Sequence, residues 1–285
     1  MRPILTSSRI IRTGQPLALE TIKQVCPAVF ANEAHESRGP RYRYVPTIEP
    51  LEMLLDNGWG VYEASQQRSR DGNRDPYTKH MLRLRRMTDF DQSDAQSHML
   101  GLDGVPEVIL INAHDGTAAY HLKAGFFRFV CSNGLMVGSH ITGFKVTHTV
   151  NSQTSKEVLE AGQRVVTENF PAMLGNIERF KNLRLTSAQA YRLAETGLKL
   201  RYGSQLPSIS ATQLLECRRP EDEEPTLWNY LNRVQEAALY GGFDTVSIGN
   251  ARHVEVRPVT RVSAVAKING GIWDEALALA DEVEA

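Results

Sequence analysis

Cysteine is scarce in this chain, and the three cysteines that occur are far apart. They are Cys26, Cys131 and Cys217, an odd number that includes no Cys-x-x-Cys pair. A disulfide framework needs paired cysteines, and a cysteine-based zinc site needs closely spaced ones, so the pattern argues against both. The cysteine content therefore favours a protein of a reducing compartment.

An excess of charge of either sign is also missing. The chain has 32 basic and 33 acidic side chains, which leaves a formal net charge of −1. A strongly basic protein would indicate nucleic acid as a partner, and bulk charge gives no such indication here. Only a local cluster of basic residues can therefore point to nucleic acid.

Long apolar runs are absent as well. No stretch approaches the roughly 20 residues that a membrane-spanning helix needs. The N-terminal segment, MRPILTSSRIIRTG, has basic residues but lacks the continuous apolar region of a signal peptide. We therefore expect a cytoplasmic protein with no membrane partner.

The known catalytic motifs are not found. The sequence contains neither the phosphate-binding P-loop pattern nor the Gly-x-Ser-x-Gly nucleophile motif. Cys131, followed by Ser132 and Asn133, is better explained as a small core residue than as a nucleophile. We therefore predict no catalytic residue, no bound metal and no cofactor, and we expect that the protein is not an enzyme.

Residues 1–150 contain short segments in which apolar and polar residues alternate, which is typical of strands. His114-Asp115-Gly116 lies between two of them and predicts a hairpin turn, because Asp and Gly tolerate positive φ. Short turns between neighbouring strands predict a largely antiparallel sheet. The predicted strands are 60–70, 77–87, 106–113 and 117–123, with further extended segments at 126–130, 135–137 and 141–149, and the predicted helices are 17–25 and 47–57.

Residues 151–285 show apolar residues at helical spacing instead. Trp228 and Trp273 lie on the apolar faces of two predicted helices, so we expect both in the core. The fold class is therefore α+β, with a largely antiparallel sheet in the first half and the helices of the second half packing on one face. We expect the sheet-rich residues 1–150 and the helical residues 151–285 to form one integrated domain. The predicted helices are 156–170, 187–201, 226–240 and 264–285.

One segment of the first half, residues 68–86, is strongly basic. Its sequence, RSRDGNRDPYTKHMLRLRR, holds seven Lys or Arg residues and two Asp residues. As a hairpin, it would present an apolar face and a basic face, because strand side chains alternate. Such a ribbon fits a phosphate backbone, and nearby tyrosines fit stacked bases. The predicted nucleic-acid-binding residues are Arg41, Arg43, Arg68, Arg70, Arg74, Tyr77, Lys79, Arg83, Arg85 and Arg86.

Two other interpretations remain open, one of the basic segment and one of the predicted turn at residues 114–116. The basic face can be a solvated surface whose charges protect a sheet edge from aggregation. Separately, His114 and Asp115 resemble the His-Asp pair of metal-dependent hydrolases, with His121 and His80 as further ligands. However, Asp also has an ordinary structural role in a hairpin turn.

Several stretches of the chain resemble one family. They are RYRYVPTIEPLEML at 41–54, YTKHMLRLRR at 77–86, PEVILINAHDGTAAYHLKAGFFRFVCSNGLMVG at 106–138 and LRYG at 200–203. In this order and spacing they resemble the YafZ/YfjQ-like family of prophage and plasmid proteins (domain of unknown function 932). The resemblance extends from about residue 17 to residue 240. It implies a mobile-element context and supplies no catalytic residues.

The basic hairpin, the order of sheet and helices, and the mobile-element context lead to one principal hypothesis. We expect a nucleic-acid binding protein that binds and anneals single-stranded DNA in recombination, working as a homo-oligomer. The alternative is an anti-restriction module whose partner is a host defence protein. A third hypothesis is a metal-dependent hydrolase at His114 and Asp115.

Overall fold

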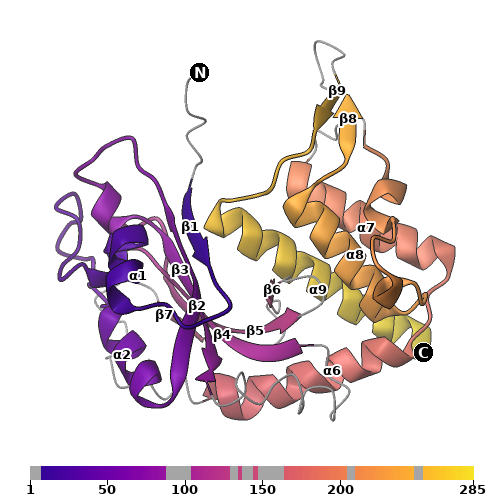
Figure 1. Cartoon of the computed structure of the whole chain (residues 1–285), viewed down its shortest axis with the longest axis horizontal. Helices are drawn as coiled ribbons and strands as arrows, with labels where there is room; N and C mark the ends of the chain where they lie inside the picture. The colour runs from indigo at the N-terminus through magenta and orange to yellow at the C-terminus, as the bar shows by residue number, and fades with distance from the viewer. Residues whose placement is uncertain are drawn as a thin grey trace. The chain divides into compact units, whose positions relative to one another are not determined.

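The structure is a computed structural model, and it describes residues 8–87, 104–128, 134–136, 144–146, 164–203, 209–246 and 253–285. The chain divides into two units. The first comprises Met1–Phe129, Thr142–Phe170 and Thr260–Val262, and the second comprises Val130–Ile141, Pro171–Val259 and Ser263–Ala285. The main sheet is built in the first unit (Figure 1).

The sheet of the first unit is antiparallel throughout, in the order β1-β2-β3-β4-β5, and β7 also pairs with β5. Its interior strands align apolar residues across the ladder, for example Ala64 with Leu82 and Leu82 with Leu110. The alternating segments are therefore strands, as predicted, and the turn at 114–116 does connect two of them. The strands are β1 (Ser8–Arg12), β2 (Trp59–Gln67), β3 (His80–Arg86), β4 (Gly104–Asn112), β5 (Tyr120–Arg128) and β7 (Phe144–Val146).

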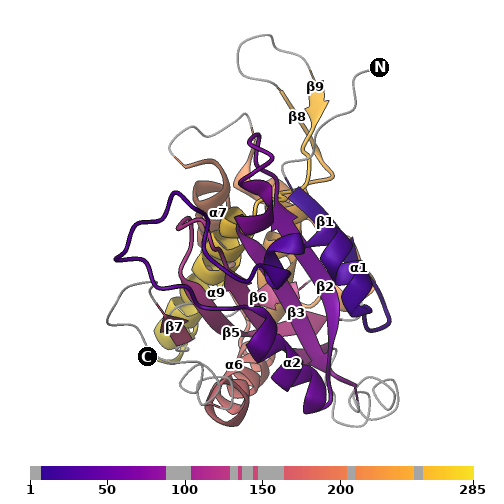
Figure 2. The same cartoon turned by 90° about the vertical axis from the view of Figure 1, so that its left-hand side faces the viewer.

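Helices from the first half cover one face of this sheet. Figure 2 shows α1 (Leu19–Val25) and α2 (Ile48–Asp56) in front of strands β1–β3. The 3-10 helix η1 (Pro27–Phe30) lies between them and is tied to β2, because the amide of Ala28 donates to Gln66 Oε1 at 2.9 Å. The core on this side contains Ile22, Leu51, Leu82, Leu84 and Leu110, all 0% exposed.

The α2 helix ends where the sequence predicts. Asn57 is its C-cap, and Gly58 follows with a φ of 81°, in the left-handed region that glycine adopts without strain. The chain then turns directly into β2. The helix therefore lies beside the strand that follows it in the sequence.

The second unit is mainly helical. Arg179 of α6 pairs with Asp281 and Glu284 of α9, and Arg192 of α7 pairs with Glu275 and Glu282 of the same helix. Acidic residues along α9 therefore tie it to two neighbours. The α-helices are α6 (Phe170–Asn182), α7 (Ser187–Tyr202), α8 (Leu227–Tyr240) and α9 (Val262–Glu284), and the π-helical turn η3 (Val165–Asn169) directly precedes α6. The 3-10 helices are η4 (Ala211–Leu215) and η5 (Pro220–Asp222). The short strands are β6 (Gly134–Met136), β8 (Asp244–Val246) and β9 (His253–Glu255).

Three predicted helices of the second half are confirmed with small shifts at their ends. Thr186 and Thr226 cap α7 and α8 by accepting from the amides of Gln189 and Asn229, which satisfies N–H groups that have no partner within the helix. Trp228 and Trp273 are buried, as expected. The predicted helix 156–170 is confirmed only from residue 164, because residues 156–163 lie outside the described residues.

The fold class is therefore α+β, as predicted, with the sheet in the first half and most helices in the second. No helix among the described residues is both long and apolar enough to cross a membrane.

Candidate functional site

Three loops meet at one end of the sheet, which we call the loop end. They are residues 31–47, between η1 and α2; residues 68–79, between β2 and β3; and residues 113–119, between β4 and β5. The backbone joins them, since the amide of His35 donates to the carbonyl of His114 at 3.0 Å and the amide of His114 donates to the carbonyl of Tyr77 at 2.8 Å. Because the strands are antiparallel, every second connection between them falls at this end. The loop 31–47 packs against the two connections 68–79 and 113–119.

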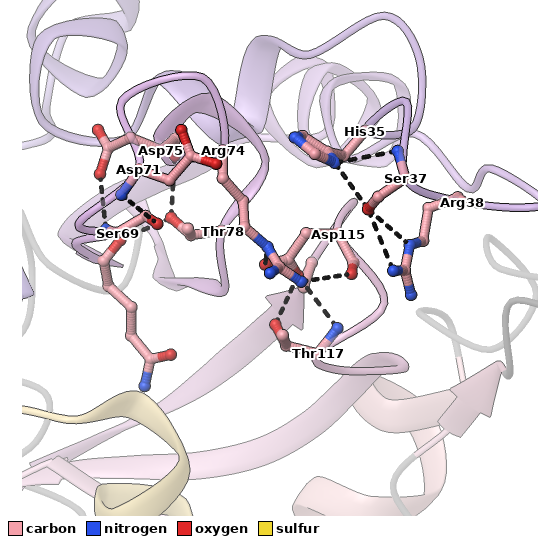
Figure 3. A network of polar contacts seen from close by, with 12 residues as sticks. His35, Ser37, Arg38, Ser69, Asp71, Arg74, Asp75, Thr78, Asp115 and Thr117 are labelled. Atoms are coloured by element: carbon pink, nitrogen blue, oxygen red, sulfur yellow. Dashed lines mark hydrogen bonds and ion pairs between the residues drawn. The ribbon is translucent and has the colours of Figure 1, made fainter.

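Ion pairs hold the loops in place (Figure 3). Arg74 Nε lies 3.1 Å from Asp115 Oδ2, and the other oxygen of Asp115 accepts from the amide and the hydroxyl of Thr117 at 3.0 and 2.6 Å. Asp75 accepts from the amide of Ser69 at 3.0 Å and pairs with Arg9 of β1. The carboxylates of Asp75 and Asp115 therefore serve to shape the loops.

A buried polar group forms the floor beneath the loops. His80 Nδ1 lies 3.0 Å from the carbonyl oxygen of Thr78, which can only accept, so Nδ1 carries the proton. In the neutral ring His80 Nε2 then accepts from the Thr47 hydroxyl at 2.9 Å. The Thr47 oxygen in turn accepts from Asn112 Nδ2 at 3.0 Å and from His114 Nε2 at 3.3 Å. One hydroxyl thus orients three buried side chains from β3, β4 and the loop after β4.

Two tyrosines fix the loop 31–47 through their hydroxyls. Tyr42 donates to the carbonyl of Ala113 at 3.0 Å, and Tyr44 donates to the carbonyl of Ala31. Burial raises the pKa of Tyr42, with a further contribution from Asp115, and burial with Glu49 raises the pKa of Tyr44 to about 12. Both hydroxyls therefore remain protonated donors across the physiological pH range.

A pocket of about 470 Å³ opens between the loops 31–47 and 68–79. A cavity of this size is within the range that small ligands occupy. Two glutamates, one histidine and one tyrosine are among its lining residues, so residues that can accept and residues that can donate hydrogen bonds surround it. It is lined by Glu33, Ala34, His35, Glu36, Gly72, Asn73, Pro76 and Tyr77.

Most of the predicted nucleic-acid-binding residues lie at or near this end. Five of them are exposed, namely Arg41, Arg43, Arg68, Arg70 and Arg86. Arg74, Tyr77 and Lys79 are half-buried, and burial lowers the pKa of Lys79 while Asp115 opposes that shift. Among these eight residues Arg86 is the exception in position, because it pairs with Trp59 at the opposite end of β3.

The expectation of an exposed basic face on β3 is wrong for Arg83 and Arg85. Each is only 2% exposed, and both bind Glu107 of β4, which is 0% exposed. Arg83 Nη2 lies 2.5 Å and Arg85 Nε lies 2.8 Å from the two oxygens of that carboxylate. The Arg85 guanidinium also lies 3.5 Å from the ring centre of Phe127 and 4.7 Å from that of Tyr62. These two arginines are engaged within the protein and are not available to a phosphate backbone.

The metal-ligand set proposed around His114 and Asp115 is not assembled either. The side chain of His114 is directed to Thr47, whereas that of Asp115 is directed to Arg74 and Thr117. Across the residues that the structure describes, no group of three or more His, Cys, Asp or Glu side chains is arranged to hold a metal ion. The Cys131-Ser132-Asn133 segment lies outside these residues.

Sequence reasoning missed the pocket residues Glu33, His35 and Glu36. They lie in a loop with neither helical nor strand periodicity, and no motif surrounds them. The only available signal was that they precede Arg41 and Arg43 and the neighbouring Tyr42 and Tyr44 in the sequence, which is too weak to identify a pocket.

Comparison with known proteins places the chain among proteins of similar length. A family model described as a domain of unknown function, DUF932, matches residues 34–268. The UPF0380 protein YafZ of Escherichia coli K12 is 34% identical over 278 residues, which covers 98% of this chain and 97% of YafZ. The UPF0380 protein YfjQ of the same organism is 34% identical over 267 residues, covering 94% and 93%. No solved structure gives a significant match.

Proposed function

The chain belongs to the DUF932 family, and on that premise we propose that it is a cytoplasmic protein that binds single-stranded nucleic acid, DNA in the first place, at the loop end of its sheet. The proposal follows from the chemistry of this chain, since the names of its relatives describe no activity. It keeps the predicted class of partner and changes the predicted surface, from the strand face of β3 to the loops.

The observation that carries the proposal is a set of exposed arginines on two adjoining loops. Arg68 and Arg70 lie on the loop 68–79, and Arg41 lies on the loop 31–47. None of the three has an ion-pair partner within the described part of the chain, whereas Arg74 and Arg9 of the same region are neutralised by aspartates. Unpaired, exposed guanidiniums are suited to phosphate groups, because they bind them bidentately without first breaking an internal pair.

An aromatic residue lies on the same loop as Arg68 and Arg70. Tyr77 is half-buried, lines the pocket and contacts the ring of His35 edge to face at 5.3 Å. Proteins that bind single strands combine a basic track for the backbone with aromatic rings for the bases. Stacking on a ring requires an unpaired base, which favours a single strand over a duplex.

The proposed role is annealing of single strands within a mobile element, which is the biological context that the family resemblance implies. Such a role requires contacts with phosphates and bases but no catalytic residue. Self-association would bring several loop ends to one strand and raise the affinity through multivalency.

The test of this surface is a triple variant, Arg41→Ala, Arg68→Ala and Arg70→Ala. We expect weaker binding of a labelled single-stranded oligonucleotide. A plot of log K against log salt should have a slope shallower by about 2, because each of the three arginines that no longer neutralises a phosphate removes roughly 0.7. Fluorescence anisotropy at several salt concentrations measures both quantities.

A matched control removes the same charge elsewhere, through Arg164→Ala, Arg261→Ala and Lys267→Ala, which are also exposed. It should bind like the wild type. If the two triple variants lose affinity equally, or if neither loses any, the loop end is not the binding surface.

A further inference from the structure

The pocket at the loop end is lined by residues that can accept and residues that can donate hydrogen bonds. Its acceptors are the carboxylates of Glu33 and Glu36, both exposed and without an ion-pair partner among the described residues. Its donor is His35, which is only 8% exposed. The aromatic wall is Tyr77.

The orientation of the His35 ring is determined by its neighbour Ser37. The amide of Ser37, which can only donate, lies 3.2 Å from His35 Nδ1, and the Ser37 hydroxyl lies 2.8 Å from the same atom. Arg38 donates to the Ser37 oxygen through Nε at 3.3 Å and Nη2 at 3.1 Å, so the hydroxyl hydrogen is left to donate to Nδ1. Nδ1 is therefore an acceptor, and the neutral ring carries its proton on Nε2.

The opposite nitrogen, Nε2, points away from Ser37 (Figure 3). It has no hydrogen-bond partner among the residues that the structure describes. His35, which lines the pocket, thus has one N–H donor in a fixed orientation that is not used within the described residues.

Charge is separated between the pocket and its surroundings. Glu33 and Glu36 lie in the pocket wall, whereas Arg41, Arg68 and Arg70 lie elsewhere on the same loops. Two carboxylates repel a phosphate, so the pocket suits the base of a nucleotide and the arginines suit its backbone.

Guanine is the base whose edge fits these groups. Its N1–H and N2 amino group are adjacent donors that one carboxylate accepts in parallel, and its O6 accepts from an N–H. Adenine, cytosine and thymine each lack the pair of adjacent donors. An unpaired base in a protein pocket is held by hydrogen bonds to this edge and by stacking on an aromatic ring.

We propose that the pocket lined by Glu33, His35, Glu36 and Tyr77 receives one unpaired guanine of the bound strand. A glutamate carboxylate accepts from N1 and N2, His35 Nε2 donates to O6, and the Tyr77 ring packs against the base. This inference rests on the proposed function, because it assigns a base preference to the same single-strand site.

The experiment compares labelled dodecathymidine with oligonucleotides that carry a single central dG, deoxyinosine, dA or dC. Deoxyinosine keeps O6 and N1–H and lacks only the amino group at C2. We expect the dG strand to bind about tenfold more tightly than dodecathymidine, since a bidentate base contact discriminates by a factor of this order. The deoxyinosine, dA and dC strands should lose most of that gain.

The variants Glu33→Gln and Glu36→Gln, singly and together, replace an acceptor oxygen by an amide donor. We expect the double variant to lose the preference for dG while its affinity for dodecathymidine stays equal to or above that of the wild type, because negative charge is removed. The control is Glu52→Gln, an exposed glutamate of α2, which should keep the preference.

Equal binding of all the strands by the wild-type protein would overturn the guanine pocket and leave the proposed function standing. Retention of the dG preference in the double variant would overturn it as well. If no oligonucleotide binds, the proposed function fails, and the pocket is then judged by calorimetry with guanosine and inosine monophosphates. If neither monophosphate binds, or if both bind equally well, the assignment of the pocket to guanine is contradicted as well.

Discussion

Arg83 and Arg85 extend from β3 to the same carboxylate on β4. Burial lowers the pKa of Arg85, and Glu107 opposes that shift by attraction and by hydrogen bonding. Glu63 of β2, which is opposite Arg83 in the sheet register, adds a smaller attraction to Arg85, and the rings of Phe127 and Tyr62 contact the Arg85 guanidinium. Glu107 is therefore the residue on which this group of charges depends.

We predict that Glu107→Ala lowers the free energy of unfolding by about 3–5 kcal/mol, because it removes the buried carboxylate that both arginines bind. Urea denaturation followed by circular dichroism measures the change. The matched control is Glu52→Ala on the exposed face of α2, which we expect to change stability by no more than about 0.5 kcal/mol. A decrease below about 1 kcal/mol for Glu107→Ala would contradict the view that the two buried arginines depend on Glu107.

The sequence predicted some of this arrangement. Alternation along β3 correctly separated Arg83 and Arg85 from Leu82 and Leu84, because side chains of a strand point to opposite faces. It could not show that the arginine side is buried, because Glu107 lies on another strand. The register that pairs Leu84 with Val108, next to Arg85 and Glu107, exists only in the folded sheet.

At the scale of elements, the helix pair α7 and α8 depends on one glycine. A Cβ at Gly197 would lie 2.7 Å from Val234 Cγ1, closer than real Cβ contacts come. The absence of a side chain lets the two helices approach, at the cost of the lower helix propensity of glycine.

We predict that Gly197→Ala destabilises the protein by about 1 kcal/mol or more, because overpacking exceeds the gain in helix propensity. The same substitution at Gly175 of α6, where a Cβ would meet nothing within 4 Å, should instead stabilise by about 0.5–1 kcal/mol. Thermal or urea unfolding distinguishes the two signs. Equal stabilisation by both variants would contradict close packing of α7 on α8.

Elements with clear periodicity and end signals were predicted well. Strand β3 alternates, β4 contains a continuous apolar run, α2 ends at Asn57-Gly58, and α7 and α8 begin after capping threonines. The strand β1 was missed, because two adjacent isoleucines between arginines show no alternation and only pairing with β2 makes the segment a strand. The loops at the loop end were missed for a similar reason, since backbone bonds between distant segments determine their shape.

For the whole molecule, a net charge of −1 conceals a local separation of charge. Acidic residues line the pocket of the loop end, arginines without an ion-pair partner among the described residues lie on the same loops, and aspartates neutralise Arg9 and Arg74 nearby. The net charge does not reveal these groups, because their opposite charges cancel in the sum. A surface of this kind becomes visible only when the three loops are placed together.

The most direct measurement of the central claim is the affinity of the wild-type protein for a labelled single-stranded oligonucleotide over a range of salt concentrations, with the corresponding duplex in parallel. We predict tighter binding of the single strand, with log K falling by roughly 0.7 for each neutralised phosphate per decade of salt. No binding at low salt, or an affinity that does not change with salt, would contradict a nucleic-acid site at the loop end.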